Sequence, residues 1–221
     1  MIFDRLAPYY DQFIDPDLND IYIEFIQKYY DEGTVIDLGC GTGPLSVELA
    51  QMGYFVTATD ISINMLERAS NNAVEGGVHI QFYVHNIEEP LNQTYDCLLM
   101  TSDVINYLET ENQVLNAFKN VSNAMHKKSI FVFDFIHLQY VERIHNHSQD
   151  ILLDDDVLQW SVRKTNVANQ IKHTLKFGNK VESHIQTTFP IKTYRQLLSD
   201  AGLVVVKKKR TDERVIYVCK R

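Results

Sequence analysis

Val35-Ile36-Asp37-Leu38-Gly39-Cys40-Gly41-Thr42-Gly43 is the stretch of sequence that decides the fold of this chain. A short apolar run leads into glycines at alternate positions, and a proline then opens a segment that favours a helix. This order predicts a strand over Thr34–Leu38, a tight turn, and a helix over Pro44–Met52. Because glycine has no Cβ, such a turn lets a ligand approach the bare backbone.

The first 135 residues repeat this alternation of strand and helix. The strands are nearly continuous apolar runs, as expected where both faces of a sheet are buried. Regular alternation predicts a doubly wound α/β fold with a mostly parallel sheet and right-handed crossovers. Further strands are expected at 54–59, 78–84, 95–100 and 129–135, with helices over 110–125 and after Ser62, a good N-cap residue.

The sequence changes in character after residue 150. Polar and apolar residues mix over 157–167, 170–177 and 180–189, and turn residues such as Gly178-Asn179 separate these segments. We expect three antiparallel strands, forming a small β-meander attached to the main sheet. Pro190 then opens a last helix, and strands at 203–206 and 215–219 form a hairpin. The prediction is one domain over 1–221, with 157–189 inserted as a cap.

Composition narrows the functional classes. The 221 residues carry 21 Lys and Arg against 29 Asp and Glu, a net charge of −8 that disfavours a nucleic-acid substrate. The chain shows neither a signal peptide nor a long apolar span, so we expect a cytoplasmic protein without membrane contact. His145, His147, Asp150 and Asp154–Asp156 do not supply a complete ligand set, so no metal is expected.

Two acids indicate what the glycine turn binds. Asp60 ends the second expected strand, 17 residues after Gly43, where a carboxylate can accept hydrogen bonds from a ribose diol. Dinucleotide-binding turns carry a further glycine where this chain has Pro44. Asp37 would also repel a pyrophosphate, whereas it suits a ligand whose near end is cationic. Alternatively, the glycines form only a tight turn and Asp60 caps the next helix.

The motif V-I-D-L-G-C-G-T-G, followed by T-A-T-D, resembles the first two motifs of class I S-adenosylmethionine-dependent methyltransferases. A-P-Y-Y-D, D-V-I-N-Y-L and E-R-V-I-Y-V-C-K resemble segments of a group of small bacterial methyltransferases with a β-insertion. The resemblance implies a seven-stranded Rossmann-like sheet whose last strand is antiparallel. A similar cap occurs in N,N-dimethyltransferases that act on amino sugars.

The same resemblance implies which residues contact each part of the cofactor S-adenosylmethionine. Backbone of the glycine turn contacts the methionine end, Asp60 holds the ribose, and Ile61 and Met65 pack against the adenine. Asn86 stands where the family usually has Asp, so it would accept a weaker, uncharged hydrogen bond from the adenine amino group. Tyr9 and Tyr10 correspond to family residues that fold over the cofactor as a lid; alternatively, either one alone has a plain packing role. The expected cofactor contacts are Tyr10, Asp37, Gly39, Cys40, Gly41, Asp60, Ile61, Met65, Asn86, Ile87 and Ser102.

The methyl acceptor is expected at the loop Thr101–Tyr107, which follows the fourth strand. Asp103 is the candidate proton acceptor or amine anchor, with Asn106 and Tyr107 as orienting groups. Alternatively, Asp103 caps a short helix and Tyr107 belongs to the core. In the meander Glu182, His184 and Gln186 alternate, which places them on one sheet face, either as a substrate wall or as a solvated surface.

The sequence therefore predicts an enzyme that methylates nitrogen or oxygen of a small or medium-sized metabolite. One alternative is an RNA or protein methyltransferase, although the chain has no N/D-P-P-Y/F motif and no Pro-Cys nucleophile. Another is a non-catalytic domain that binds the cofactor and regulates a partner. The unpaired edges of the meander could also join two copies into a homodimer.

Overall fold

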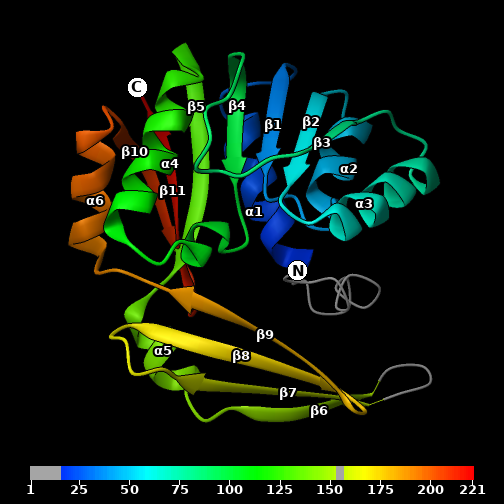
Figure 1. Cartoon of the computed structure of the whole chain (residues 1–221). Helices are drawn as coiled ribbons and strands as arrows, with labels where there is room; N and C mark the ends of the chain where they lie inside the picture. The colour runs from blue at the N-terminus through cyan, green and yellow to red at the C-terminus, as the bar shows by residue number, and fades with distance from the viewer. Residues whose placement is uncertain (1–15, 153–156) are drawn as a thin grey trace.

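The unit predicted around the glycine turn lies at the centre of a seven-stranded sheet in the computed structural model, which describes residues 16–152 and 157–221. Beside it is a separate four-stranded sheet, β6–β9, called here the second sheet (Figure 1). The strands are β1 Thr34–Leu38, β2 Phe55–Asp60, β3 Gln81–Val84, β4 Tyr95–Met100, β5 Met125–Ile136, β6 Ser148–Leu152, β7 Val157–Lys164, β8 Gln170–Phe177, β9 Lys180–Thr187, β10 Val204–Arg210 and β11 Arg214–Lys220.

The central sheet has the strand order β10-β11-β5-β4-β1-β2-β3. Its strands pair in parallel except at β11, which is antiparallel to both β5 and β10. The expected mostly parallel, doubly wound sheet with an antiparallel last strand is thus confirmed. The helices are α1 Pro16–Gln27, α2 Pro44–Gln51, α3 Ile63–Glu75, the 3₁₀ helix η2 Val104–Tyr107, α4 Glu111–Asn123, α5 Leu138–Ile144 and α6 Ile191–Asp200.

Helices cover both faces of the central sheet, because alternate side chains of each strand point to opposite sides. Along β5, Phe131, Phe133 and Phe135 pack against α4 and α6, while Ile130 and Val132 pack on the side of α1, α2 and α3. The three phenylalanines are fully buried. None of the helices in the described ranges combines the length and apolar character needed to cross a membrane.

The order of the strands reverses between β1 and β4, which pair in parallel at the middle of the sheet. The first helices after β1 lie on one face, and α4, which follows β4, lies on the other. Such a reversal leaves a crevice at the carboxyl ends of the strands. In Figure 1 these ends, marked by the arrowheads of β1, β2 and β4, point toward the second sheet.

The second sheet differs from the expected meander in two respects. It has four antiparallel strands instead of three, in the order β6-β7-β8-β9, and it is separate from the central sheet. The additional strand, Ser148–Leu152, was missed because its residues are mostly exposed and carry little apolar pattern. Pairing with β7, the next strand along the chain, forms this strand, although its own residues carry no strand pattern.

Other differences lie at the ends of elements. α5 was not expected, and at seven residues it is too short to give a clear helical period. β5 starts at Met125, because α4 ends at Asn123 rather than continuing to residue 125. β3 is shorter than the expected 78–84 and lies at the edge of the sheet, mostly exposed. Ser62 caps α3 as expected, accepting from Met65 N.

Gly39 provides a test of what the turn requires. Its φ is +79°, and an added Cβ would lie 2.6 Å from Val104 Cγ2. Gly53 has a comparable φ of +96° with open space around it, so it serves as the matched control. We expect Gly53→Ala to lower the free energy of unfolding by about 1–2 kcal/mol, from backbone strain alone. Gly39→Ala should cost about 1–3 kcal/mol more, because the clash adds to the strain.

Denaturant unfolding of the two variants measures both losses. Equal losses would show that Val104 moves away from the added Cβ without any further loss of stability.

Candidate functional site at the carboxyl ends of the strands

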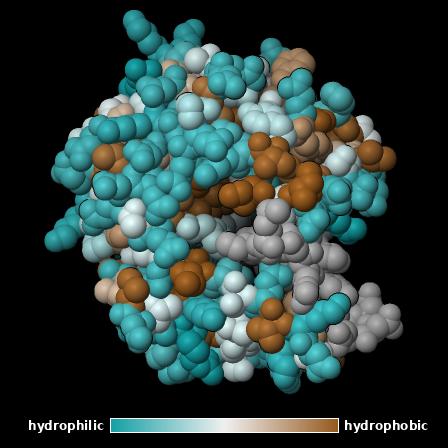
Figure 2. Space-filling model, viewed as in Figure 1, coloured by the Kyte–Doolittle hydropathy of each residue, from teal (hydrophilic) through white to brown (hydrophobic). Residues whose placement is uncertain are grey.

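A cavity of about 270 Å³ opens where the carboxyl ends of β1, β2 and β4 meet. Figure 2 shows the molecule hollowed between the central body and the second sheet, with hydrophobic side chains bordering the hollow. The expected site residues that line this cavity are Asp37, Gly39, Cys40, Gly41, Asp60, Ile61, Met65, Asn86, Ile87, Ser102 and Tyr107. Tyr10 and its neighbour Tyr9 lie outside the described residues.

The glycine turn is held against the end of β2. The backbone N–H groups of Gly39 and Cys40 both donate to the Thr59 carbonyl at 2.8 Å. Gly39, Gly41 and Gly43 have φ between +57° and +80°, a conformation that L side chains rarely adopt. The glycines are therefore needed for the path of the chain, and they leave the backbone open toward the cavity.

Asp37 is the buried acid of the turn, with 2% of its surface exposed. Burial raises its pKa to about 6, against the opposing effect of the Ser46 hydroxyl, which donates to Asp37 Oδ2 at 2.7 Å. Ser46 lies in the first turn of α2, so this helix places the hydroxyl that donates to Asp37. An ionised carboxylate held this way favours a cation at the mouth of the turn.

Asp60 ends β2 and accepts two backbone hydrogen bonds. Its Oδ2 accepts from Gly41 N at 3.0 Å and its Oδ1 from Ser62 N at 2.8 Å. Burial raises its pKa, and the backbone N–H groups partly oppose this shift. A carboxylate has about four lone-pair sites, so both oxygens can still accept from a ligand diol.

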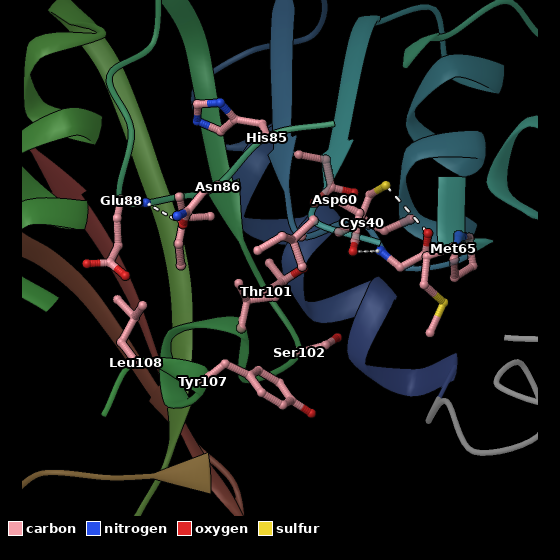
Figure 3. A pocket seen from close by; sticks show the side chains of 18 of the residues that line it. Cys40, Asp60, Met65, His85, Asn86, Glu88, Thr101, Ser102, Tyr107 and Leu108 are labelled. Carbon is pink, nitrogen blue, oxygen red and sulfur yellow. Dashed lines mark hydrogen bonds between the residues drawn. The ribbon is translucent and has the colours of Figure 1, made fainter. Parts of the chain in front are cut away.

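The opposite side of the cavity is formed by the segment after β3. Asn86 Oδ1 accepts from Glu88 N at 3.1 Å, and Gln113 Nε2 donates to Glu88 Oε1 at 2.9 Å. In Figure 3, Asn86 and Glu88 face Cys40, Asp60 and Met65 across the cavity. Sequence reasoning had assigned no individual contact in the site to several lining residues: Asn19, Pro44, Leu45, His85, Glu88, Thr101, Val104, Leu108 and Gln113.

The loop after β4 closes the cavity below (Figure 3). Ser102 and Asp103 have φ of +56° and +58°, and η2 follows directly. Tyr107 lines the cavity, and its ring centroid lies 5.8 Å from that of His184 in β9. Tyr107 is only partly buried, so the alternative of a simple core residue is not favoured.

Asp103 is not among the residues that line the cavity, and its side chain makes no cap bond to η2. Its Oδ1 accepts from Arg214 Nη1 at 2.7 Å, and its Oδ2 accepts from Gln186 Nε2. Its backbone N–H donates to Asp134 Oδ1 at 3.0 Å. Asp134 Oδ2 in turn accepts from the same Arg214 Nη1 at 2.7 Å.

The network around Arg214 was missed by sequence reasoning. A signal existed for Asp134, since it is a lone acid within the apolar strand S-I-F-V-F-D-F and is fully buried. Nothing local identified its partner, because Arg214 lies 80 residues further along the chain. Asn106, expected to orient the acceptor, is buried and connects two backbone segments. Its Nδ2 donates to Thr187 O at 2.9 Å, and its Oδ1 accepts from Ile136 N at 3.0 Å.

The charge of the cavity is negative. Asp37, Asp60 and Glu88 line it, and no lysine or arginine of the described ranges does. Burial lowers the pKa of His85, so this imidazole adds no positive charge at neutral pH. Within the same ranges no three His, Cys, Asp or Glu side chains gather as metal ligands. Asp154–Asp156 lie outside these ranges.

In the second sheet the expected shared face is present but is not solvated. His184 and Gln186 are 8% and 4% exposed, and Glu182 is half-buried. The interpretation of these residues as an exposed sheet surface is therefore wrong for the two that lie nearest η2. The face is turned toward the central body, where β9 contacts η2.

Comparisons with known proteins agree with this site. Residues 35–128 match the model of a family described as a methyltransferase domain. A protein of Geobacillus sp. (strain WCH70), named as a methyltransferase, is 29% identical to this chain. The alignment has 250 positions and covers 100% of both chains.

Two solved structures show the same fold. An S-adenosylmethionine-dependent methyltransferase from Clostridium acetobutylicum superposes with a TM-score of 0.84 at 21% identity, covering 99% of this chain and 98% of its own. An amino pentose methyltransferase from Micromonospora echinaspora, solved with S-adenosylmethionine bound, gives a TM-score of 0.76 at 17% identity, covering 97% and 95%. With the family match over residues 35–128 and the full-length relative, they show that the chain is similar to S-adenosylmethionine-dependent methyltransferases and shares their fold.

Proposed function

We propose that this protein transfers the methyl group of S-adenosylmethionine to nitrogen or oxygen of a small or medium-sized metabolite. The observation that carries the proposal is the cavity itself, an acidic space without lysine or arginine among its described lining residues, set on a glycine turn. A cationic cofactor is favoured there, whereas the pyrophosphate of a dinucleotide would be repelled.

The residues present suit this cofactor. Asp37 would attract its ammonium group, the backbone of Gly39 and Gly41 would contact its methionine end, and Asp60 would accept from its ribose hydroxyls. At the other side of the cavity, Asn86 and the backbone of Ile87 would bind the adenine, which Ile61 and Met65 would flank. Ile61 is 57% exposed, so it has apolar surface to cover when a ligand binds.

When bound, S-adenosylmethionine would supply a methyl group on a sulfonium. The acceptor lone pair would form a bond to the methyl carbon in line with the breaking C–S bond, and the sulfur would leave as a neutral thioether. The protein's own contribution is alignment and exclusion of water. Ser102 and Tyr107 line the cavity beside the space under the second sheet, so we assign them contacts to the cofactor and to the acceptor, respectively. The acidic lining favours an acceptor that is uncharged or cationic over one that carries phosphate or carboxylate.

Asp103 belongs to this proposal in an orienting role. Each of its carboxylate oxygens already accepts from a side-chain donor, one of them the Arg214 guanidinium. Because donors already occupy both oxygens, we assign Asp103 to positioning the loop rather than to proton transfer. A neutral amine acceptor would need no base before attack, because its lone pair is already free.

The second sheet serves as the substrate-selecting cap in this proposal. It lies across the carboxyl ends of the strands that form the cavity (Figure 1). Segments placed over an active site commonly carry specificity while the core fold carries stability. An amino pentose methyltransferase shares this fold along almost its whole length. This likeness supports, for the acceptor here, a polar metabolite similar in size to an amino pentose.

The cofactor can be tested by calorimetry. We expect S-adenosylmethionine and its demethylated product to bind and NAD not to bind. Asp60→Ala should weaken cofactor binding by about 1.5–3 kcal/mol, the usual contribution of hydrogen bonds to a charged group. Glu75→Ala is the control, because it removes an exposed acid outside the cavity and should leave affinity unchanged. Tight NAD binding, or full affinity in the Asp60 variant, would contradict the proposal.

The pKa of Asp37 predicts how affinity depends on pH. A carboxylate with a pKa raised to about 6 loses its charge as pH falls through that value, so affinity for the cationic cofactor should fall between pH 7.5 and 5. Asp37→Asn should bind more weakly at pH 7.5, and its remaining pH dependence should be smaller. Titration calorimetry at several pH values measures both.

The same shift predicts an opposite effect on stability. An acid whose pKa is raised by folding destabilises the folded state once it is ionised, so the cost is absent below about pH 4 and complete above about pH 6. Asp37→Asn should therefore raise the free energy of unfolding at pH 7.5, by up to about 3 kcal/mol for a shift from 3.8 to about 6, and by little at pH 4. A variant less stable at both pH values would refute this account.

A further inference from the structure

A continuous chain of hydrogen bonds crosses the second sheet and reaches the loop after β4. Trp160 Nε1 donates to His173 Nδ1 at 3.2 Å, and His173 Nε2 lies 3.0 Å from Gln186 Oε1. Gln186 Nε2 then donates to Asp103 Oδ2. The chain thus starts in β7, passes through β8 and β9, and ends on a residue next to the cavity wall.

Both ends of the chain fix the same direction of donation. An indole N–H can only donate, so His173 Nδ1 must be the accepting nitrogen. An ionised carboxylate can only accept, so the amide nitrogen of Gln186 must face Asp103. The amide oxygen then faces His173, whose Nε2 must carry the proton. Each member has one orientation that satisfies its neighbours.

The surroundings keep His173 in this neutral form. Burial lowers its pKa to about 4, although the hydrogen bond that His173 donates to Gln186 opposes the shift. Its ring is stacked on that of His184, with the centroids 4.8 Å apart and an angle of 9° between the planes. The His184 centroid lies 5.8 Å from that of the Tyr107 ring. Burial lowers the pKa of His184 to about 3, with a smaller contribution from repulsion between the two rings when both carry a proton. At neutral pH the second sheet therefore presents uncharged rings to the loop.

The Ser102–Tyr107 loop, where the hydrogen-bond chain ends, has a backbone conformation that other contacts must stabilise. Ser102 and Asp103 are consecutive non-glycine residues with positive φ, which costs free energy and persists only where surrounding contacts impose it. On one side Arg214 and Asp134 bind Asp103, and on the other side Gln186 does. The same loop supplies Ser102, Val104 and Tyr107 to the cavity.

We propose that Gln186 is a positioning residue for methyl transfer, oriented through His173 by Trp160, which holds the Ser102–Tyr107 loop in its cavity-lining conformation. The second sheet then acts on the site through a directed hydrogen-bond chain in addition to covering it. The effect on turnover rests on the proposed function, whereas the effect on the loop does not.

Hydrogen exchange measured by mass spectrometry on the full chain tests the positioning. Gln186→Met keeps the length of the side chain and removes both hydrogen bonds. We expect exchange in peptides covering 101–107 to rise about tenfold or more, as for loss of a hydrogen bond to a charged group, while peptides covering β1 stay unchanged. Ser183→Ala, on the exposed face of the same strand, is the control and should change neither.

Unchanged exchange at 101–107 in Gln186→Met would overturn the inference, and so would a rise spread evenly over the chain, since that reports general destabilisation. Trp160→Phe keeps an aromatic ring and removes the first donor, and it tests the chain independently if Gln186→Met does not fold. In that variant, imidazole nitrogen NMR should show His173 as a mixture of tautomers, with exchange at 101–107 raised. A single Nε2–H tautomer with normal exchange would contradict the role of Trp160.

Turnover provides the second readout once an acceptor is in hand. Gln186→Met should lower kcat more than it weakens cofactor binding, and the double variant with Trp160→Phe should lose no more than Gln186→Met alone, because the chain is already cut. Additive losses would overturn the directed chain. If cofactor binds and no metabolite is methylated, the proposed function fails while the exchange experiment still decides the inference.

Discussion

Arg214 binds two carboxylates through one nitrogen, and the arrangement of the site depends on this contact. Its Nη1 lies 2.7 Å from both Asp103 Oδ1 and Asp134 Oδ2. Burial lowers the pKa of Arg214, but the charges of both acids outweigh it and raise that pKa well above its ordinary value. Removing one partner from such a group leaves a buried charge unpaired, which typically costs about 3–5 kcal/mol. The ion pair joins the last strand of the sheet to the loop beside the cavity.

The glycine turn and its acids show where function opposes stability. Asp37 and Asp60 are almost completely buried, and burial raises the pKa of both. An apolar residue would pack at lower cost in the same places, so the fold accepts two destabilising carboxylates at one edge of its sheet. Because Ser46 and backbone N–H groups bind these acids, they remain available as anions for a cationic ligand.

The second sheet is connected to the central body through polar contacts in addition to a small apolar cluster, in which Val162 and Ile171 pack against Ile136 of β5. Asn106 reaches the backbone of both Thr187 and Ile136, and Gln186 reaches Asp103. Hydrogen bonds need a defined distance and direction, whereas apolar packing tolerates small displacements. A sheet attached in this way has a defined position relative to the cavity, and an acceptor bound between them, as proposed above, would have to match it.

The sequence by itself determined the strand, turn and helix around Gly39, the cap at Ser62 and the place of Asp60, because short-range periodicity and turn chemistry act within a few residues. It also predicted the parallel sheet, since alternating elements leave few allowed connections. Only the tertiary structure decided that Asp103 meets Arg214, 111 residues away, and that Gln186 is buried. It also made a strand of the polar segment Ser148–Leu152. The contacts of Asp103 and Gln186 depend on where the crossovers bring distant segments together, and no local pattern encodes that.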